Sequence, residues 1–211
     1  MIPTRTTTRL RRSFLFVPGS EERKLAKAAG LGADAVILDL EDGVAAARKA
    51  EARAQVRTVL QAQDGQEIEW LIRLNGFSTS YFEADLEASV RAGPDALVIP
   101  KVNSPDMLLQ VDAHLTEAEH AAAIPFGTFK LFALIESAQG ILYAPAIATA
   151  TPRLLGLMLG HVDLCADLDS VGNSVGADER LDAAKRDLDV FARRGQFLVL
   201  SPPAKDKTGG C

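Results

Sequence analysis

Polar residues that could carry chemistry follow one apolar run after another in this sequence. Acids follow three of the runs, an arginine and an asparagine close a fourth, and a lysine closes a fifth; these residues are Asp39, Glu41, Asp42, Arg73, Asn75, Lys101, Glu136 and Asp163. A single residue of this kind can be only a turn former or a helix cap. Here five apolar runs in succession are followed by polar residues, and these include both acids and bases. Turn formation and helix capping are therefore a weaker explanation for the whole set. If the runs are parallel strands of a barrel, their carboxyl ends meet at the rim where active sites lie.

Glu136 and Asp163 are the candidate metal ligands. Mg²⁺ prefers hard oxygen donors and usually takes one or two protein carboxylates, which leaves positions for water and substrate. Two neighbouring strand ends could supply that pair. The histidines His114, His120 and His161 are not part of a set of three or four His and Cys residues at zinc spacing, so zinc is disfavoured. We expect His161, which stands beside the expected site, to line it.

Arg73 is the candidate anchor for a substrate carboxylate, because a guanidinium binds a carboxylate bidentately and an ammonium does not. The alternative is a structural salt bridge with Asp39 or Glu41. We place Asp39 and Glu41 with Arg73 in the candidate catalytic set, and Glu41 or Asp42 could orient Arg73 or water ligands of the metal. Lys101 could hold a phosphate or a carboxylate, or pair with the acidic rim.

Seven short apolar runs predict the strands that must position these residues. Most are continuously apolar, which is typical of strands buried on both faces of a parallel sheet; they are Ser13–Val17, Ala35–Leu40, Trp70–Leu74, Ala96–Ile99, Leu131–Ile135, Leu154–Leu159 and Phe197–Leu200. The segments between them are expected to be helices with apolar stripes, the clearest being Ala52/Val56/Val59/Leu60, Phe82/Leu86/Val90, Met107/Leu108/Val111/Leu115 and Leu181/Ala184/Leu188/Phe191. The third opens with Ser104 as N-cap and Pro105 at the first helical position.

Repeated alternation of strand and helix predicts an α/β fold with a parallel sheet. An open doubly wound sheet and a closed barrel compete. The first strand is followed by Val17-Pro18-Gly19-Ser20, which is not the glycine-rich turn of a dinucleotide-binding sheet.

The motifs, taken in order, resemble the citrate lyase β-subunit-like branch of the HpcH/HpaI aldolase superfamily from about Arg12 to Asp169. They are Arg12-Ser-Phe-Leu-Phe-Val-Pro-Gly19, Ala35-Val-Ile-Leu-Asp-Leu-Glu-Asp-Gly-Val44, Arg73-Leu-Asn75, Ile99-Pro-Lys101, Ile135-Glu-Ser-Ala-Gln-Gly140 and Gly160-His-Val-Asp-Leu164. The resemblance implies a TIM-type (β/α) barrel, usually a homotrimer or a larger assembly such as a hexamer. It implies Mg²⁺ held at Glu136 and Asp163, and a substrate gripped by Arg73. Asn75 and Lys101 are further candidates for substrate binding, and the resemblance adds Pro18 and Gly19 to them.

The function implied is that of a Mg²⁺-dependent carbon–carbon lyase. It would cleave or form a β-hydroxyacyl-CoA thioester such as malyl-CoA or citramalyl-CoA, with a keto acid and an acyl-CoA as the products. Glu41 and a water bound to the metal are the candidates for the base that takes the hydroxyl proton. One alternative is the citryl-acyl-carrier lyase subunit of a citrate lyase complex. Another is a truncated, non-catalytic thioester-binding relative, and an aldolase acting on free keto acids is a weaker possibility.

Composition limits the class of protein. The chain has 211 residues, enough for one sizeable domain, and its net charge of −5 argues against a general role in binding nucleic acid. No apolar run reaches the length of a membrane span. The two cysteines, Cys165 and Cys211, make no disulfide framework, so we expect a reducing, cytoplasmic location, with Cys165 as a packing residue.

Three regions are expected along the chain: a basic N-terminal arm (1–12), a (β/α) barrel domain (13–200) and an irregular tail (201–211). The tail is rich in turn residues and nearly without apolar ones. We therefore expect a barrel of about seven strands, incomplete at the C-terminus because the eighth is missing. Unpaired strand edges would then favour marginal stability, strong association or reduced activity.

Overall fold

In the part of the chain that the structure describes, seven parallel strands form one sheet whose spatial order follows the chain order, β1 to β7. The computed structural model describes residues 11–62, 68–168 and 197–198. The strands are β1 (Phe14–Pro18), β2 (Ala35–Asp39), β3 (Glu69–Arg73), β4 (Ala96–Ile99), β5 (Lys130–Ile135), β6 (Leu154–Leu159) and β7 (Phe197–Leu198). Strictly sequential order is that of a (β/α) barrel, whereas a doubly wound sheet reverses its order at a switch point. The predicted TIM-type α/β fold is therefore confirmed.

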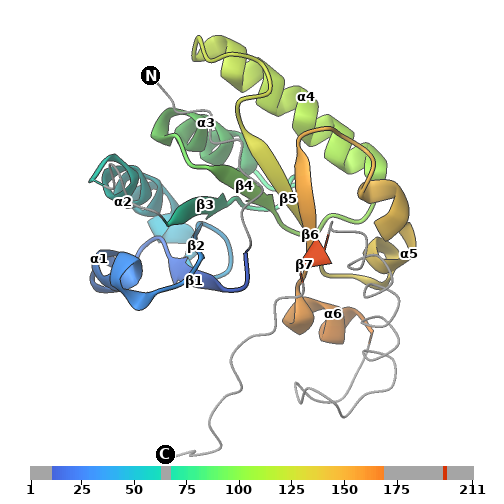
Figure 1. Cartoon of the computed structure of the whole chain (residues 1–211), viewed down its shortest axis with the longest axis horizontal. Coiled ribbons are helices and arrows are strands. Elements are labelled where there is room, and N and C mark those ends of the chain that lie inside the picture. The colour runs from blue at the N-terminus through green and yellow to red at the C-terminus, as the bar shows by residue number, and fades with distance from the viewer. Residues whose placement is uncertain (1–10, 63–67, 169–196, 199–211) are drawn as a thin grey trace, which may run out of the picture.

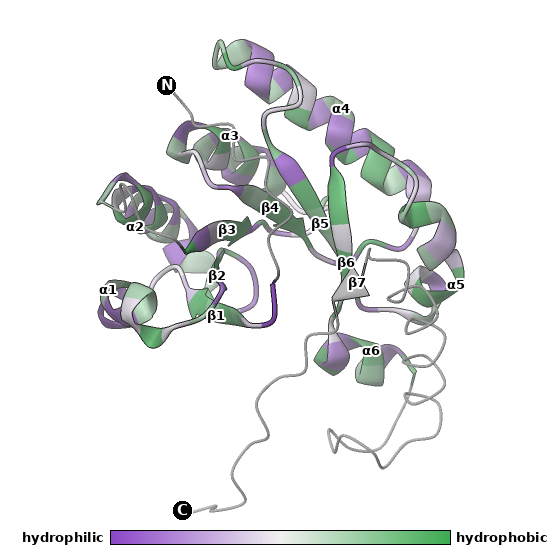
Figure 2. Ribbon diagram, in the orientation of Figure 1, coloured by the Kyte–Doolittle hydropathy of each residue, from purple (hydrophilic) through white to green (hydrophobic). Residues whose placement is uncertain are grey.

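Helices follow the strands and lie on the outer face of the curved sheet, except for the last described helix, which lies beyond the end of β6 (Figure 1). They are α1 (Glu22–Ala28), α2 (Lys49–Ala62), α3 (Phe82–Ala92), α4 (Pro105–Ala121), α5 (Ala138–Ile147) and α6 (His161–Asp167), with short 3₁₀ turns η1 (Ala29–Leu31) and η2 (Ala46–Arg48). Ser104 caps α4 as predicted, because its hydroxyl accepts the Met107 N–H at 3.2 Å and Pro105 occupies the first turn. Figure 2 shows apolar strands at the centre and hydrophilic residues on the outer faces of α2 and α4.

The strands bury both of their faces in two separate apolar clusters. Alternate residues, such as Val36 and Leu38 of β2, pack against the helices. The residues between them face the inside of the curved sheet, where Ile37 lies with Leu71, Val98, Phe132, Leu134 and Met158. Because side chains alternate along a strand, the inward column of each strand ends at a predictable residue at the rim. For β2, β3, β5 and β6 those residues are Asp39, Arg73, Glu136 and Gly160.

The opposite, amino-terminal ends of the strands are tied by ion pairs. Arg11 pairs with Glu69 at the start of β3, and its guanidinium lies 5.4 Å from the Phe132 ring. Arg12 pairs with Asp34 just before β2, at 3.1 Å. The last two residues of the expected basic arm are thus held against the sheet.

The six strands from β1 to β6 begin and end within one residue of their predicted bounds. The predicted helix with the stripe Leu181–Phe191 and the tail at 201–211 lie outside the described residues. The prediction that the eighth strand is missing therefore stays a prediction. Among the residues described, no helix is long and apolar enough to cross a membrane.

Candidate active site

Asp39 ends β2 and fixes the loop that follows it. The residue is 3% exposed, and its two carboxylate oxygens accept the backbone N–H groups of Glu41 at 2.8 Å and Gly43 at 2.9 Å. A Cβ at Gly43 would stand 2.5 Å from Asp39 Oδ2, so the turn requires a glycine there. The loop is thereby wound around the carboxylate.

Arg73 ends β3 directly opposite Asp39 in the sheet register. Its Nε and Nη2 each donate to the Asp39 carboxylate at 2.8 Å, and Nη1 lies 3.1 Å from Glu41 Oε2. The guanidinium also lies 5.1 Å from the centre of the Phe16 ring. Burial lowers the pKa of Arg73, but the neighbouring carboxylates outweigh it and raise the pKa above its ordinary value. The salt bridge considered for Arg73 forms with both acids at once.

Lys101 follows β4 in a left-handed conformation, with φ of 56°, which is uncommon for a residue other than glycine. Its backbone N–H donates to Glu136 Oε2 at 2.9 Å. Its ammonium lies 3.0 Å from Glu41, 3.4 Å from Asp163 and 3.7 Å from Asp42. Lys101 therefore joins the acids of three strand ends. Of the partners considered for it in the sequence, the structure shows the acidic residues of the rim.

Glu136 and Asp163 both contact this lysine, Glu136 at its backbone N–H and Asp163 at its ammonium. Glu136 is 7% exposed, and its pKa is raised to about 7, chiefly by burial and then by the nearby charge of Glu41. A Cβ at Gly160 would overlap the Glu136 carboxylate, so this glycine leaves the room that the carboxylate fills. A pocket of about 420 Å³ opens beside them, lined by Lys101, Asn103, Glu136, Ser137, Asp163, Ala166 and Asp167.

The donor set fits Mg²⁺ better than a softer metal. Glu136 and Asp163 offer carboxylate oxygens next to an open pocket, and Mg²⁺ typically uses one or two such ligands and keeps several waters. Across the described parts of the chain, no group of three or more His, Cys, Asp or Glu side chains could enclose a metal ion. A site made by these residues would be of the open kind, with positions left for substrate.

Asn75 lies behind the rim, not in its mouth. It is 4% exposed, and its side-chain amide donates to the Leu40 carbonyl at 2.9 Å and to Asp85 at 2.5 Å. Its side-chain oxygen accepts from the Lys49 ammonium at 2.7 Å. The interpretation of the sequence missed Lys49 and Asp85, because each looks like an ordinary polar position of an amphipathic helix.

Pro18 and Gly19 stand at the end of β1, next to the end of β2. Pro18 is the register partner of Asp39, and the Gly19 N–H donates to the Asp39 carbonyl at 2.8 Å. A Cβ at Gly19 would meet that carbonyl at 2.9 Å and Val56 at 3.0 Å. Close packing of two strand ends accounts for this glycine, and its predicted contact with the substrate stays a prediction.

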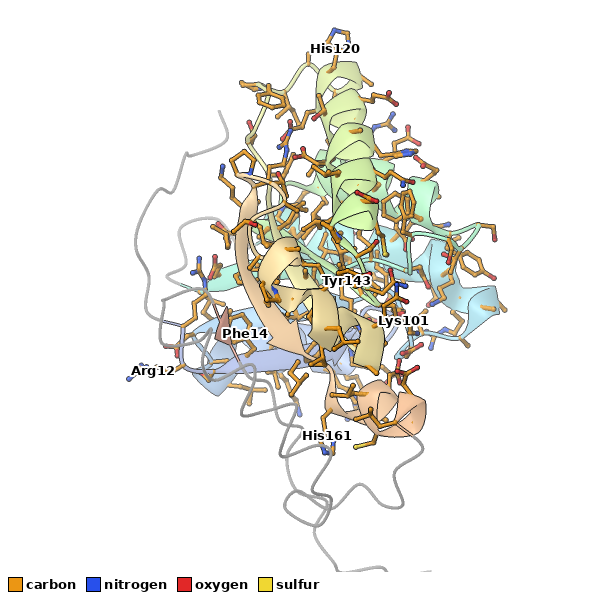
Figure 3. All side chains as sticks on the ribbon, turned by 90° about the vertical axis from the view of Figure 1, so that its right-hand side faces the viewer. Arg12, Phe14, Lys101, His120, Tyr143 and His161 are labelled. Carbon is orange, nitrogen blue, oxygen red and sulfur yellow. The ribbon has the colours of Figure 1, made fainter. Side chains whose placement is uncertain are left out.

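His161 begins α6, and Cys165 lies one turn further along the same helix. His161 is 3% exposed, Cys165 is 4% exposed as expected for a packing residue, and Sγ lies 3.6 Å from the ring Nε2. Figure 3 places His161 and Lys101 toward the same end of the molecule, with His120 at the opposite end. His161 thus lies near the rim, but its side chain is buried in the core below the rim.

A TIM-type (β/α) fold with acids and bases at the carboxyl ends of its strands defines a barrel protein whose site lies at that rim. The chain belongs to the HpcH/HpaI aldolase/citrate lyase family, whose model matches residues 12–203. It is 38% identical over 160 residues to citrate lyase subunit beta of Leuconostoc mesenteroides, covering 76% of this chain and 53% of that protein. It is 45% identical over 159 residues to a (3S)-malyl-CoA thioesterase of Cereibacter sphaeroides, covering 75% and 52%. The chain thus spans about half the length of these curated relatives.

Solved structures carry the same fold. The citrate lyase beta subunit of Mycobacterium tuberculosis, complexed with oxaloacetate and magnesium, matches with a TM-score of 0.70 and 29% identity, covering 88% of this chain and 76% of that one. Protein CitE of the same organism, in complex with magnesium and pyruvate, matches with a TM-score of 0.73 and 27% identity, covering 94% and 78%.

Proposed function

We propose that this protein is a Mg²⁺-dependent carbon–carbon lyase. It cleaves or forms a β-hydroxyacyl-CoA thioester such as malyl-CoA or citramalyl-CoA, with a keto acid and an acyl-CoA as the products. The observation that carries the proposal is the convergence of charged residues at one rim: Lys101, Glu136 and Asp163 line an open pocket, and Glu41 links Lys101 to Arg73. Relatives named for citrate lyase and for malyl-CoA chemistry, and structures that hold magnesium with small keto acids, support the substrate class.

Cleavage breaks the bond between the α and β carbons of the thioester. The hydroxyl on the β carbon loses its proton and becomes the carbonyl of the keto acid. The bonding electron pair stays on the α carbon as a thioester enolate, which takes up a proton to give the acyl-CoA. Glu136 and Asp163 would hold the cation, which when bound supplies positive charge beside the oxygens that become negative.

The other residues of the rim bind, orient and take the proton. Arg73 donates to Asp39 and lies against Glu41, which leaves guanidinium N–H groups for a substrate carboxylate. Glu41 is 4% exposed and bridges Arg73 and Lys101, and burial raises the pKa of its carboxyl. We assign Glu41 to accept the hydroxyl proton, because its carboxylate lies between Arg73, which would hold the substrate carboxylate, and Lys101, which also contacts Asp163.

A second candidate is cleavage of a citryl thioester on an acyl-carrier protein, which the likeness to citrate lyase subunit beta favours. Such a protein would work with partner subunits. The first candidate would work as a homo-oligomer, a trimer or a hexamer, in the cytoplasm.

Purified protein should be incubated with Mg²⁺ and malyl-CoA, citramalyl-CoA or a citryl thioester, and the keto acid and acyl thioester products measured. Cleavage that requires the metal, and that Glu136→Gln abolishes, is the expected result. Glu117→Gln on the exposed face of α4 is the matched control. If no thioester is cleaved under conditions in which the protein is folded, the proposed lyase activity is wrong.

A further inference from the structure

Lys49, the first residue of α2, places a buried ammonium behind the rim. The residue is 7% exposed, and its Nζ donates to the carbonyls of Leu40 and Glu41 and to the side-chain oxygen of Asn75, each at 2.7 Å. An ammonium has three N–H donors, so these three bonds use all of them. Every acceptor is a neutral oxygen, and two belong to the backbone of the loop that carries Glu41.

A buried ammonium is an expensive choice at this position. Removing a charge from water costs several kcal/mol in proteins, and burial lowers the pKa of Lys49, with the charges of Asp39 and Asp85 acting in the opposite direction. An apolar side chain of similar size would often be neutral or more favourable for stability alone. The three bonds to the loop and to Asn75 therefore point to a purpose beyond filling space.

The bonds of Lys49 continue into a network that joins three elements. Asn75, after β3, donates to the Leu40 carbonyl at 2.9 Å and to Asp85 of α3 at 2.5 Å. Arg53, one turn along α2 from Lys49, donates to the other oxygen of Asp85 at 2.8 Å. The carbonyl of Leu40 thus receives two donors, and the network fixes the loop against α2, α3 and the end of β3.

Both backbone groups of Glu41 are held by charged side chains. Its N–H donates to Asp39 at 2.8 Å, and its carbonyl accepts from Lys49 at 2.7 Å. With the backbone fixed, the carboxylate reaches Lys101 at 3.0 Å on one side and Arg73 at 3.1 Å on the other. We infer that Lys49 is a positioning residue, which holds the backbone at Leu40 and Glu41 so that the Glu41 carboxylate bridges Arg73 and Lys101. The effect on turnover rests on the function proposed above.

The test compares Lys49→Met with Lys27→Met, an exposed lysine on α1, in the full chain. Lys49→Met keeps most of the side-chain length and removes the three donors. We expect kcat to fall about 10- to 100-fold, because a displacement of about 1 Å at a reacting group has that effect, and KM to change much less. Backbone hydrogen exchange of a peptide covering residues 39–44 should become faster in Lys49→Met and stay unchanged in Lys27→Met.

Asp85→Asn provides a second variant in case Lys49→Met does not fold. It keeps the shape of the side chain and weakens the support of Asn75, so exchange over residues 39–44 should increase and kcat should fall, both by less than in Lys49→Met. Wild-type kcat and wild-type exchange in this loop, with only a lower Tm, would overturn the inference for whichever variant is folded. If the wild type itself cleaves no thioester, the proposed function fails, whereas the exchange comparison still decides the role of Lys49.

Discussion

Asp39 and Arg73 are direct cross-strand partners at the ends of β2 and β3, joined by two hydrogen bonds of 2.8 Å. The carboxylate is itself fixed by the N–H groups of Glu41 and Gly43. A fork-to-fork pair of this kind sets the plane of the guanidinium as well as its position. The remaining N–H groups of Arg73 are thereby held in a fixed direction before any substrate binds.

Replacing Arg73 with lysine should remove this geometry while keeping the charge. An ammonium is a point charge and cannot bind Asp39 and a substrate carboxylate with parallel bonds. We expect kcat/KM to fall about 10- to 100-fold, which corresponds to roughly 1.5–3 kcal/mol for lost hydrogen bonds to charged groups. Steady-state kinetics with the thioester that the wild type cleaves would measure this. An Arg73→Lys protein with wild-type kcat/KM would show that only the charge of Arg73 matters.

Gly160→Ala should disturb the site through a single methyl group. Its Cβ would overlap the Glu136 carboxylate, whereas a Cβ at Gly30 meets nothing within 4 Å, so Gly30→Ala is the matched control. We expect Gly160→Ala to lose most of its turnover and to bind a divalent cation more weakly, with little loss of fold. Equal activity in the two variants would mean that the position of Glu136 is unimportant.

Metal binding should depend on Glu136 and Asp163, whether or not the substrate has been identified. Electron paramagnetic resonance of free Mn²⁺, used as a probe for Mg²⁺, measures binding without turnover. Glu136→Gln and Asp163→Asn should each raise the Kd at least about tenfold, since even changes to the groups that hydrogen-bond to metal ligands cost about 10- to 100-fold in affinity. Glu117→Gln should bind as the wild type does. Unchanged Mn²⁺ binding in both site variants would place the cation elsewhere.

The sequence was sufficient to predict the sheet and the rim, for a physical reason. Strands buried on both faces are continuously apolar, so runs such as Ala96–Ile99 stand out, and the first polar residue after each run falls at the carboxyl end. The structure confirms that the predicted residues lie together at one rim; they are Asp39, Arg73, Lys101, Glu136 and Asp163. Their chemical roles stay predictions.

Helices without a clear apolar stripe and contacts behind the rim could not be predicted in this way. α1 and α6 have seven residues each, too short for a stripe, and α5 carries no charged residue to mark an outer face. The network around Lys49 depends on which helix face meets which loop. Asn75 illustrates the limit, because its place after a strand predicted a substrate contact, whereas the fold turns its amide toward Leu40 and Asp85.

A buried network at the amino-terminal side of β6 should support stability alone. Arg153, before β6, donates to both oxygens of Glu119 at 2.8 Å, and Glu119 also accepts the N–H groups of Gly127 and Phe129 at 2.9 Å. Both residues of the ion pair are 2% exposed or less. Glu119→Gln removes this charge but leaves Asp112 as a charged partner of Arg153, so the free energy of unfolding should fall by about 1.5–3 kcal/mol, the range for hydrogen bonds to charged groups. The kcat of the folded protein should stay unchanged.

The same pair predicts how stability varies with pH. Burial raises the pKa of Glu119, but the bonds from Arg153, Phe129 and Gly127 outweigh it, so the folded pKa lies below the ordinary glutamate value. A lowered folded pKa contributes stability that is fully present above the unfolded pKa and is lost as the pH falls through the folded pKa. Urea unfolding of wild type and Glu119→Gln should therefore differ most near neutral pH, and the difference should shrink as the solution becomes acidic. A difference that stays constant down to acid pH would mean that Glu119 stabilises the fold by its packing and not by its charge.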